Sequence, residues 1–376
     1  MNNQNDKKKV FVALSGGVDS SVSAALLKQA TPNNFEKLFG RPTPKGFRGY
    51  DVTGVFIKVW HPEFLPCTWK EERRDAMRVC AHLGISFLTF DLEKEYKKEV
   101  VDYMVHEYKT GRTPNPDVMC NKYVKFGEFF KQSMKMGADY IATGHYARVK
   151  FNEKSGTYHL LKGIDSNKDQ SYFLWTLTQD VLKRTLFPVG QYAKPQVRKL
   201  AEKFGLATAN KKDSQGLCFI GKLDMKDFLK GFINEKEGVV LTQEKEVIGV
   251  HNGAAFYTIG QRHGFTLTKQ NPEMSPYYVI DKETKGNTIT VSPIVTIQNK
   301  DTVKLENTNW IGDSPQETNI YEARTRYRQK LSLSEVSNTS GNHTMITFSN
   351  ALPLSPPGQS LVLYDNERCM GGGIIM

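Results

Sequence analysis

The stretch VFVALSGGVDSSVSAALL, residues 10–27, predicts a strand, a glycine turn and a helix in direct succession. Residues 9–14 are apolar and rich in strand-favouring side chains, and residues 20–29 continue as a helix. Two adjacent glycines allow a tight turn and bring backbone N–H groups close to a ligand. The start of the following helix attracts anions. The stretch therefore predicts a phosphate-binding turn, Ser15 to Ser21, although a plain strand–helix turn with a capping serine has the same local pattern.

Asp19 lies inside this turn, where a carboxylate would repel phosphate unless a cation lies between them. We expect Mg²⁺ to accompany a bound nucleotide there, directly or through water. The turn is neither the G-x-x-x-x-G-K-[ST] loop nor the dinucleotide G-x-G-x-x-G loop. The histidines and cysteines show no metal-binding spacing, so no metal site built from a side-chain cluster is expected.

The first part of the chain continues to alternate strands and helices. Further strands are expected at 52–59, 85–90 and 139–143, and helices at 69–83, 93–109 and 122–136. Such alternation predicts a parallel sheet with helices on both faces, which binds ligands at the carboxyl ends of its strands. SGGVDSS and TGHYAR (143–148) each follow a strand, so both are expected at one edge of the sheet. Residues 31–50, with three prolines and three glycines, are interpreted as a surface insertion.

The residue pattern of the sequence changes after about residue 210. Short helix signals and loops follow, and from residue 277 onward the pattern is that of β-strands. Residues 277–292 form two alternating runs around a Lys-Gly-Asn turn, which predicts a hairpin. We expect an N-terminal α/β domain (1–212), a small mixed central domain (213–276) and a C-terminal all-β barrel (277–376).

Composition narrows the class of protein. The 376 residues are 39% hydrophobic and 24% charged, as in ordinary soluble proteins. No apolar run approaches the roughly 18 residues of a membrane span, and the N-terminus has no secretory signal, so a cytoplasmic protein is expected. The net charge of +11 favours a polyanionic partner such as a nucleic acid, although a solvated lysine-rich surface gives the same charge.

The five cysteines, an odd number without a C-x-x-C pair, argue against a disulfide framework. Cys120 follows two prolines and is expected to open a helix beside Lys122, and Cys218 follows two lysines and a Ser-Gln-Gly turn. Thiols at helix starts near lysine ionise readily, so this pair suggests covalent sulfur chemistry. Cys80 and Cys369 are expected to be structural, and Cys67 is assigned no chemistry.

Motifs along nearly the whole chain, in order, resemble those of the bacterial tRNA-specific 2-thiouridylases, a family of pyrophosphatase-loop ATPases. The matching blocks are ALSGGVDSSV (13–22), EYKTGRTPNPDVMCNK (107–122), GADYIATGHYAR (137–148), NKDQSYFL (167–174), LFPVG (186–190), KKDSQGLCFIG (211–221), YTIGQRHG (257–264), TRYRQ (325–329), PGQS (357–360) and GGGII (371–375). The resemblance implies an N-terminal domain of the adenine nucleotide alpha hydrolase type, related to Rossmann folds. It also implies adenylation of the C2 oxygen of the wobble uridine by ATP, and its replacement by sulfur.

The resemblance implies roles for particular residues. Those expected to bind ATP are Ala13, Leu14, Ser15, Gly16, Gly17, Val18, Asp19, Ser20, Ile57 and Gly144. Those expected to meet the target base or the tRNA are Asn115, Pro116, Asp117, His145, Lys168, Asp169, Gln170, Arg326, Tyr327 and Gln359. Cys218 would carry a persulfide, and Cys120, the nucleophile, would release its sulfur and leave a Cys120–Cys218 disulfide. Asp117 would either transfer protons or cap the following helix.

One departure from the family pattern concerns the adenine site. Ile57-Lys58-Val59-Trp60 replaces the usual Met-Lys-Asn-Trp, a change that a backbone contact to adenine would survive. The resemblance also implies a sulfur donor, either a cysteine desulfurase or a sulfur-relay protein, and we expect a monomer. Two alternatives use the same features. A pyrophosphatase-loop ligase or amidotransferase would not need two reactive thiols, and a catalytically idle tRNA-binding protein would not release AMP.

Overall fold

The computed structural model describes residues 7–64, 69–212, 224–268, 276–293, 302–339, 343–350 and 355–376. Its first sheet contains five strands, and every pairing in it is parallel. In order across the sheet they are β3 (Ser86–Asp91), β2 (Tyr50–Lys58), β1 (Lys8–Ala13), β4 (Tyr140–Ala142) and β7 (Thr185–Leu186). The predicted parallel α/β domain is confirmed.

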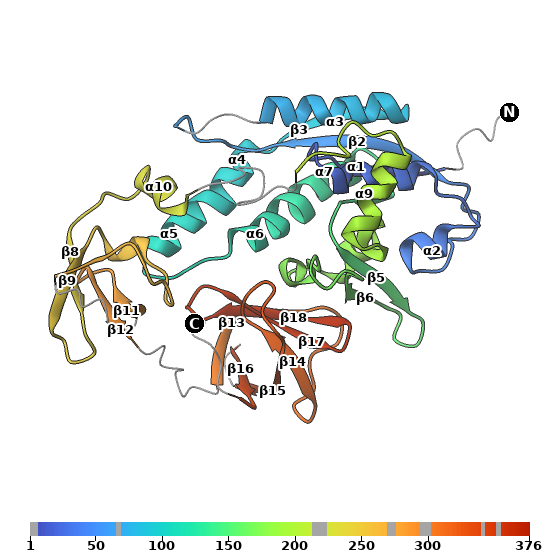
Figure 1. Ribbon diagram of the computed structural model, residues 1–376. Coiled ribbons are helices and arrows are strands. Elements are labelled where there is room, and N and C mark those ends of the chain that lie inside the picture. Colours follow the sequence, from blue (N-terminus) through green and yellow to red (C-terminus); the bar gives the residue numbers. More distant parts are fainter. Residues whose placement is uncertain are drawn as a thin grey trace.

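Helices cover both faces of this sheet, as Figure 1 shows for α3 on one side and α5 and α6 on the other. Alternate residues of β1 explain the two layers, because Phe11 joins one apolar cluster while Val10 and Val12 join the other. The helical elements of the domain are α1 (Val18–Lys28), α2 (Phe35–Phe39), α3 (Trp69–Leu83), α4 (Glu93–Tyr96), η1 (Lys97–Asp102), α5 (Tyr103–Lys109), α6 (Pro116–Met119), η2 (Cys120–Glu128), α7 (Phe129–Lys135), η3 (Ser171–Leu174), α8 (Gln179–Lys183), η4 (Pro188–Gln191) and α9 (Lys194–Lys203).

The segment expected as a surface insertion, 31–50, contributes side chains to the apolar cluster that also contains Val10 and Val12 of β1. It contains α2, and the rings of Phe35, Phe39, Phe47 and Tyr50 are buried and in mutual contact, with ring centroids 4.7–6.3 Å apart. The interpretation of the whole segment as a surface feature is therefore wrong. Its aromatic residues decide its structure more than its prolines and glycines do, because aromatic side chains bury large apolar areas.

The second sheet has the strand order β10-β9-β8-β12-β11. The expected hairpin at 277–292 is present as the antiparallel pair β11–β12, and β12 pairs in parallel with β8. This sheet therefore contains strands from both sides of the expected boundary at residues 276 and 277. Its elements are α10 (Met225–Lys230), β8 (Gly238–Leu241), β9 (Val247–His251), η5 (Ala254–Phe256), β10 (Thr266–Leu267), β11 (Tyr278–Glu283) and β12 (Thr288–Ser292).

The C-terminal strands form an antiparallel barrel, as expected. Six strands are joined in the order β13-β16-β15-β14-β17-β18, and a pairing between β13 and β18 closes the ring. They are β13 (Thr302–Trp310), β14 (Ile320–Arg324), β15 (Ser332–Thr339), β16 (His343–Phe348), β17 (Ser360–Asp365) and β18 (Arg368–Ile375).

A hairpin of the N-terminal part of the chain joins the barrel to the α/β domain. It consists of β5 (Ala147–Asn152) and β6 (Thr157–Lys162), and β6 pairs with the start of β18. This hairpin follows directly on the TGHY motif, so the barrel is anchored close to the edge of the first sheet (Figure 1). Within the described part of the chain, the helices are too short or too polar to cross a membrane.

Candidate nucleotide and thiol site

The glycine turn lies at the carboxyl end of β1, where α1 begins. Gly16 has a φ of +71°, and a Cβ atom there would lie 2.5 Å from the carbonyl oxygen of Glu72. Gly17 is the N-cap of α1, and the hydroxyl of Ser21 donates to its carbonyl oxygen at 2.7 Å. Ser15 is exposed at the mouth of the turn. The missing Cβ atom of Gly16 thus lets the turn pack closely against Glu72, and the turn presents an exposed hydroxyl at the start of a helix, where phosphate groups bind.

Gly144 confirms that the two motifs meet at one edge of the sheet. It follows β4, and a Cβ atom on it would lie 2.7 Å from the amide nitrogen of Ser20 and 2.9 Å from the carbonyl carbon of Asp19. Gly144 therefore permits the close approach of the β4 loop to the turn. Of the other residues expected to bind ATP, Leu14, Val18 and Ile57 are buried and Ala13 is half-buried, so their side chains belong to the apolar core.

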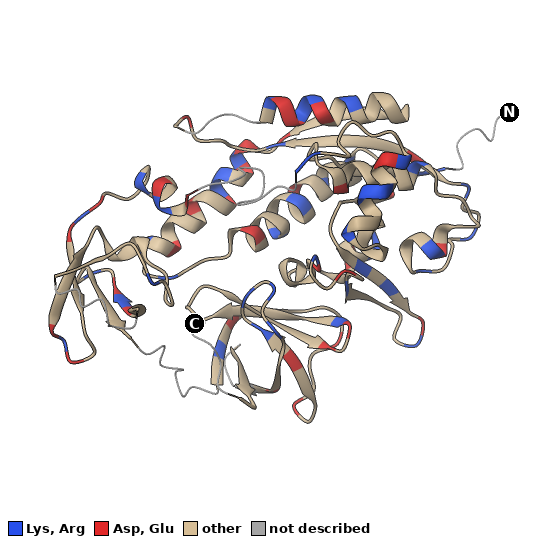
Figure 2. Ribbon diagram, in the orientation of Figure 1, with Lys and Arg blue, Asp and Glu red and all other residues tan. Residues whose placement is uncertain are grey.

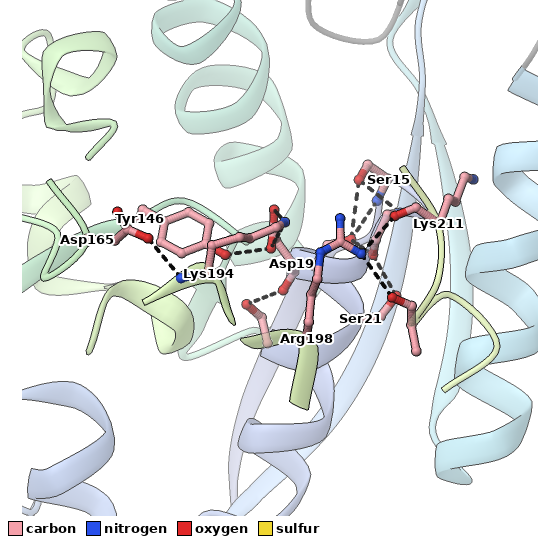
Figure 3. A network of polar contacts seen from close by, with 12 residues as sticks. Ser15, Asp19, Ser21, Tyr146, Asp165, Lys194, Arg198 and Lys211 are labelled. Atoms are coloured by element: carbon pink, nitrogen blue, oxygen red, sulfur yellow. Dashed lines mark hydrogen bonds and ion pairs between the residues drawn. The ribbon is translucent and has the colours of Figure 1, made fainter. Parts of the chain in front are cut away.

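Asp19 is held by a network of polar groups, drawn in Figure 3. The ammonium group of Lys194, at the start of α9, lies 2.7 and 2.9 Å from its two carboxylate oxygens. The hydroxyl of Tyr146 donates to the same carboxylate at 2.7 Å. On the other side of the turn, Lys211 donates to the carbonyl oxygen of Gly16 at 3.1 Å and to Asp75 at 2.7 Å.

Lys194 and Tyr146 were not singled out in the sequence, and Lys211 was considered only as one of the two lysines before Cys218. Each lies far from the turn along the chain, and Lys194 stands in no distinctive pattern. Tyr146 belongs to the TGHY motif, whose proximity to the turn was the only available signal. With α1, the two lysines supply the positive charge that a polyphosphate needs, so the turn and its surroundings fit ATP.

The contacts of Asp19 do not favour direct coordination of Mg²⁺. Both oxygens of the Asp19 carboxylate already accept from Lys194, so direct coordination of a metal by Asp19 would require Lys194 to move. Among the described residues, no group of three or more His, Cys, Asp or Glu side chains is arranged to hold a metal ion. A magnesium ion would therefore be bound mainly through the nucleotide phosphates and water.

Cys120 lies on the helix that runs from α6 through η2 to α7. Asn115 caps this helix by accepting a hydrogen bond from the amide of Val118 at 3.3 Å, and Pro116 occupies its first turn. The helix thus begins at Pro116, so the expectation that Cys120 opens it is wrong, as is the expected start at residue 122. Cys120 is fully buried among apolar side chains. The π-type turns of η2 begin at this residue, and such wide turns are frequent at functional sites.

The capping role considered for Asp117 belongs to Asn115, and Asp117 lies in the first turn of the helix. Cys218 and Cys67 lie outside the described residues, so the pairing of Cys120 with Cys218 stays a prediction. The other two cysteines are buried, as expected of structural residues. Burial raises the pKa of the Cys80 thiol to about 11 and that of Cys369 to about 12.

His145 lies between the glycine turn and the cysteine helix. Its Nδ1 is 2.7 Å from the hydroxyl of Thr143, and its ring contacts those of Phe126 on η2 and Phe187, with centroids 5.8 and 6.1 Å away. Burial, helped by the charge of Lys125, lowers the pKa of His145 well below its ordinary value. The imidazole is therefore neutral at physiological pH and packs the two functional elements together.

Asp169 and Gln170, which are expected to contact tRNA, direct their side chains at groups of the protein, as His145 does. The Asp169 carboxylate lies 2.7 Å from the guanidinium of Arg324 on β14, and it accepts hydrogen bonds from the amides of Gly163 and Ser171 at 3.1 Å. Gln170 exchanges hydrogen bonds with the backbone of Tyr146, at 2.9 and 3.0 Å. Asp169 thus joins the α/β domain to the barrel, and its side chain is only 4% exposed.

Four other residues that are expected to contact tRNA differ in their exposure and in their partners. Arg326 is exposed, Tyr327 is half-buried with its ring centroid 4.6 Å from that of Phe173, and Lys168 is half-buried. Gln359 uses its side-chain amide to bind the backbone of Thr113 and Pro114, just before Asn115. Figure 2 shows further Lys and Arg residues along the β5–β6 hairpin and along the helices α6 to α7.

Comparisons with known proteins agree with this organisation. A model of the tRNA methyl transferase HUP domain matches residues 8–39 and 46–222. A model of the tRNA methyl transferase PRC-barrel domain matches residues 226–293, and one of the aminomethyltransferase beta-barrel domain matches residues 300–375. The fold and the glycine turn thus define an enzyme with a nucleotide-binding domain of the HUP type.

Curated relatives cover essentially the whole chain. The tRNA-specific 2-thiouridylase MnmA of Bacillus cytotoxicus is 41% identical over 382 residues, which is 100% of this chain and 96% of the relative. That of Enterococcus faecalis is 42% identical over 381 residues, covering 99% and 96%. The chain therefore belongs to the tRNA-specific 2-thiouridylase family. Among solved structures, a U34-tRNA thiolase from Methanococcus maripaludis covers 60% of this chain and 63% of its own, with 17% identity and a TM-score of 0.34, too distant to bear on the site.

Proposed function

We propose that this enzyme replaces the C2 oxygen of the wobble uridine in tRNA with sulfur, using ATP. The observation that carries the proposal is the meeting of two features at one edge of the first sheet. One feature is the glycine turn with its lysines, and the other is the helix that contains Cys120. His145 lies between the two and packs against Phe126 of this helix. The family membership gives the same class of reaction.

ATP would act first in this account. The C2 oxygen of uridine is a poor leaving group, so the oxygen attacks the α-phosphorus of ATP and pyrophosphate leaves. The turn from Ser15 to Ser20, with Lys194 and Lys211, would hold the phosphates and stabilise the negative charge on the departing pyrophosphate. Magnesium would neutralise the same charge when it is bound with ATP.

Sulfur transfer would follow on the adenylated base. The terminal sulfur of a Cys218 persulfide attacks C2, and AMP leaves with the original oxygen. The thiolate of Cys120 then attacks the Sγ of Cys218 and breaks its bond to the transferred sulfur. This step leaves 2-thiouridine and a Cys120–Cys218 disulfide, which an external thiol must reduce before the next turnover. A cysteine desulfurase or a sulfur-relay protein would supply the persulfide.

The tRNA would meet several elements at once. Asn115, Pro116 and Asp117 would face the target base, which leaves the anticodon stack to reach the site. The exposed Arg326 and the half-buried Tyr327 are suited to bind phosphate and to stack on a base. Cys120 is fully buried, so base and thiol can meet only after the helix or its surroundings move.

Nucleoside mass spectrometry tests the proposal. Purified protein is incubated with an unmodified tRNA transcript, Mg-ATP and a persulfide donor, beside Cys120→Ala and Cys218→Ala, with Cys369→Ala as the matched control. We expect 2-thiouridine that requires ATP and both Cys120 and Cys218. Formation of AMP without 2-thiouridine in the wild type would instead indicate a ligase with another acceptor.

A further inference from the structure

The hydroxyl of Tyr172 lies where three segments of the chain meet. Tyr172 belongs to the short helix η3, and the residue is only 1% exposed. Its hydroxyl oxygen lies 2.8 Å from the carbonyl oxygen of Ser360 and 3.1 Å from that of Thr325. The side chain of Asn115 hydrogen-bonds the same hydroxyl. One buried group thus joins the cap of the helix that contains Cys120 to two turns of the barrel.

The hydrogen-bonding capacity of a tyrosine matches these partners. Carbonyl oxygens can only accept, so the single proton of the hydroxyl is directed at Ser360 and Thr325. Asn115 uses its side-chain oxygen to cap the helix at the amide of Val118, so its NH₂ group is the donor to Tyr172. Burial raises the pKa of Tyr172, so the hydroxyl keeps its proton at physiological pH.

Each partner of Tyr172 adjoins residues that are expected to meet the substrate. Asn115 is itself the first residue of the Asn-Pro-Asp triplet. Thr325 directly precedes the Arg-Tyr pair at 326–327, and Ser360 directly follows Gln359. These segments are far apart in the sequence, so only tertiary contacts can set their relative positions. The Tyr172 hydroxyl is a contact that all three share.

The ring of Tyr172 and that of its neighbour are held independently of the hydroxyl. The ring of Tyr172 lies 5.7 Å from the guanidinium carbon of Arg324, which is paired with Asp169. The ring of Phe173 packs against that of Tyr327, with centroids 4.6 Å apart. These contacts do not involve the hydroxyl, so they remain when it is removed. Tyr172→Phe therefore isolates the contribution of the hydroxyl.

We propose that Tyr172 is a positioning residue: its hydroxyl fixes the Asn115 cap relative to the barrel turns at 325–329 and 357–360. The catalytic consequence rests on the proposed function, whereas the structural part holds for the protein alone. Without the hydroxyl the three segments move more independently. The target uridine is then aligned with ATP and the thiols for a smaller fraction of the time.

Hydrogen–deuterium exchange tests the structural part in the protein alone. Tyr172→Phe is compared with Tyr321→Phe, since Tyr321 is a buried barrel tyrosine whose hydroxyl accepts from the amide of Gln316 at 2.8 Å. The control thus also loses one hydrogen bond, outside the three segments. The net contribution of a hydrogen bond corresponds to roughly a 2- to 12-fold change in an equilibrium. We expect peptides that cover 113–119, 325–329 and 357–361 to exchange faster by about this factor in Tyr172→Phe alone.

Unchanged exchange in the three peptides would overturn the inference. Should Tyr172→Phe fail to fold, Asn115→Asp keeps the capping oxygen and removes the NH₂ donor to Tyr172. Faster exchange at 113–119 is then expected, and unchanged exchange there would contradict the inference in the same way.

Single-turnover formation of 2-thiouridine at saturating tRNA and the Kd for tRNA test the catalytic consequence. A positioning role predicts that Tyr172→Phe lowers the rate by about tenfold and changes the Kd by less than about threefold, with Tyr321→Phe close to the wild type in both. An unchanged rate, or an equal loss of rate in Tyr321→Phe, would overturn this role. If the wild type forms no 2-thiouridine, the proposed function fails, and the exchange rates alone decide the role of Tyr172.

Discussion

Replacement of Asp169 by asparagine tests whether this residue joins two domains or binds tRNA. The carboxylate and its partner Arg324 are 4% and 7% exposed, and 2.7 Å separates their nearest atoms. Asparagine has the same shape without the charge, so Asp169→Asn leaves a buried guanidinium without its counterion. Removal of one partner of a buried pair costs about 3–5 kcal/mol. The Tyr364 hydroxyl, 2.7 Å from Arg324, remains, so we expect a loss of unfolding free energy near the lower end, about 3 kcal/mol.

Urea denaturation of the wild type, Asp169→Asn and Arg324→Met measures this loss. Asp51→Asn, an exposed aspartate on β2, is the matched control and should change the free energy of unfolding by less than about 0.5 kcal/mol. The double variant should be more stable than the sum of the single losses implies, by about 0.5–3 kcal/mol, because both changes remove one interaction. An Asp169→Asn protein that is as stable as the wild type but binds tRNA weakly would refute the structural role.

Three further predictions concern the nucleotide edge. Lys194→Met should weaken ATP binding about tenfold or more in calorimetry, since hydrogen bonds to charged groups contribute about 1.5–3 kcal/mol; unchanged affinity would contradict a phosphate role. Gly144→Ala should abolish ATP binding in a folded protein, because its Cβ atom would lie 2.7 Å from the Ser20 amide nitrogen; normal binding would show that the loops can separate. Because the pKa of His145 is lowered in the folded protein, the imidazole of the unfolded chain binds a proton at a higher pH than that of the folded chain. The contribution of His145 to the free energy of unfolding is then retained above about pH 6.5, and below this pH it falls by up to about 1.4 kcal/mol per pH unit. Urea denaturation between pH 5 and 7 should therefore show a smaller dependence of the unfolding free energy on pH in His145→Gln than in the wild type. Equal pH dependence in the two proteins would count against a buried neutral imidazole.

The parts of the fold that could be predicted are those set by local pattern. The strand, turn and helix of residues 10–27 depend on apolar periodicity and two glycines, and the hairpin at 277–292 depends on alternation around a turn. The partner of that hairpin could not be predicted, because strand pairing is decided by tertiary contacts. In residues 31–50, prolines and glycines indicated a loop, but the spacing of four aromatic residues was the stronger physical signal.

The candidate site was predicted less completely. Asn115-Pro116 is a cap followed by a proline at the first helical position, so the true start of the cysteine helix was available in the sequence. The ion pair of Lys194 with Asp19 was not, because it joins residues 175 positions apart. The direction of the side chains could not be predicted either. Asp169 and Gln359 stand in motifs expected to contact tRNA, yet each binds groups of the protein itself.

Isotope transfer tests whether ATP activates the C2 oxygen of the target uridine. A tRNA with ¹⁸O at C2 of the wobble uridine is converted in a single turnover, and the AMP is analysed by mass spectrometry. We expect one ¹⁸O atom in the phosphate of AMP for each 2-thiouridine formed, since the oxygen leaves with AMP. AMP without ¹⁸O, formed together with 2-thiouridine, would contradict adenylation of the base.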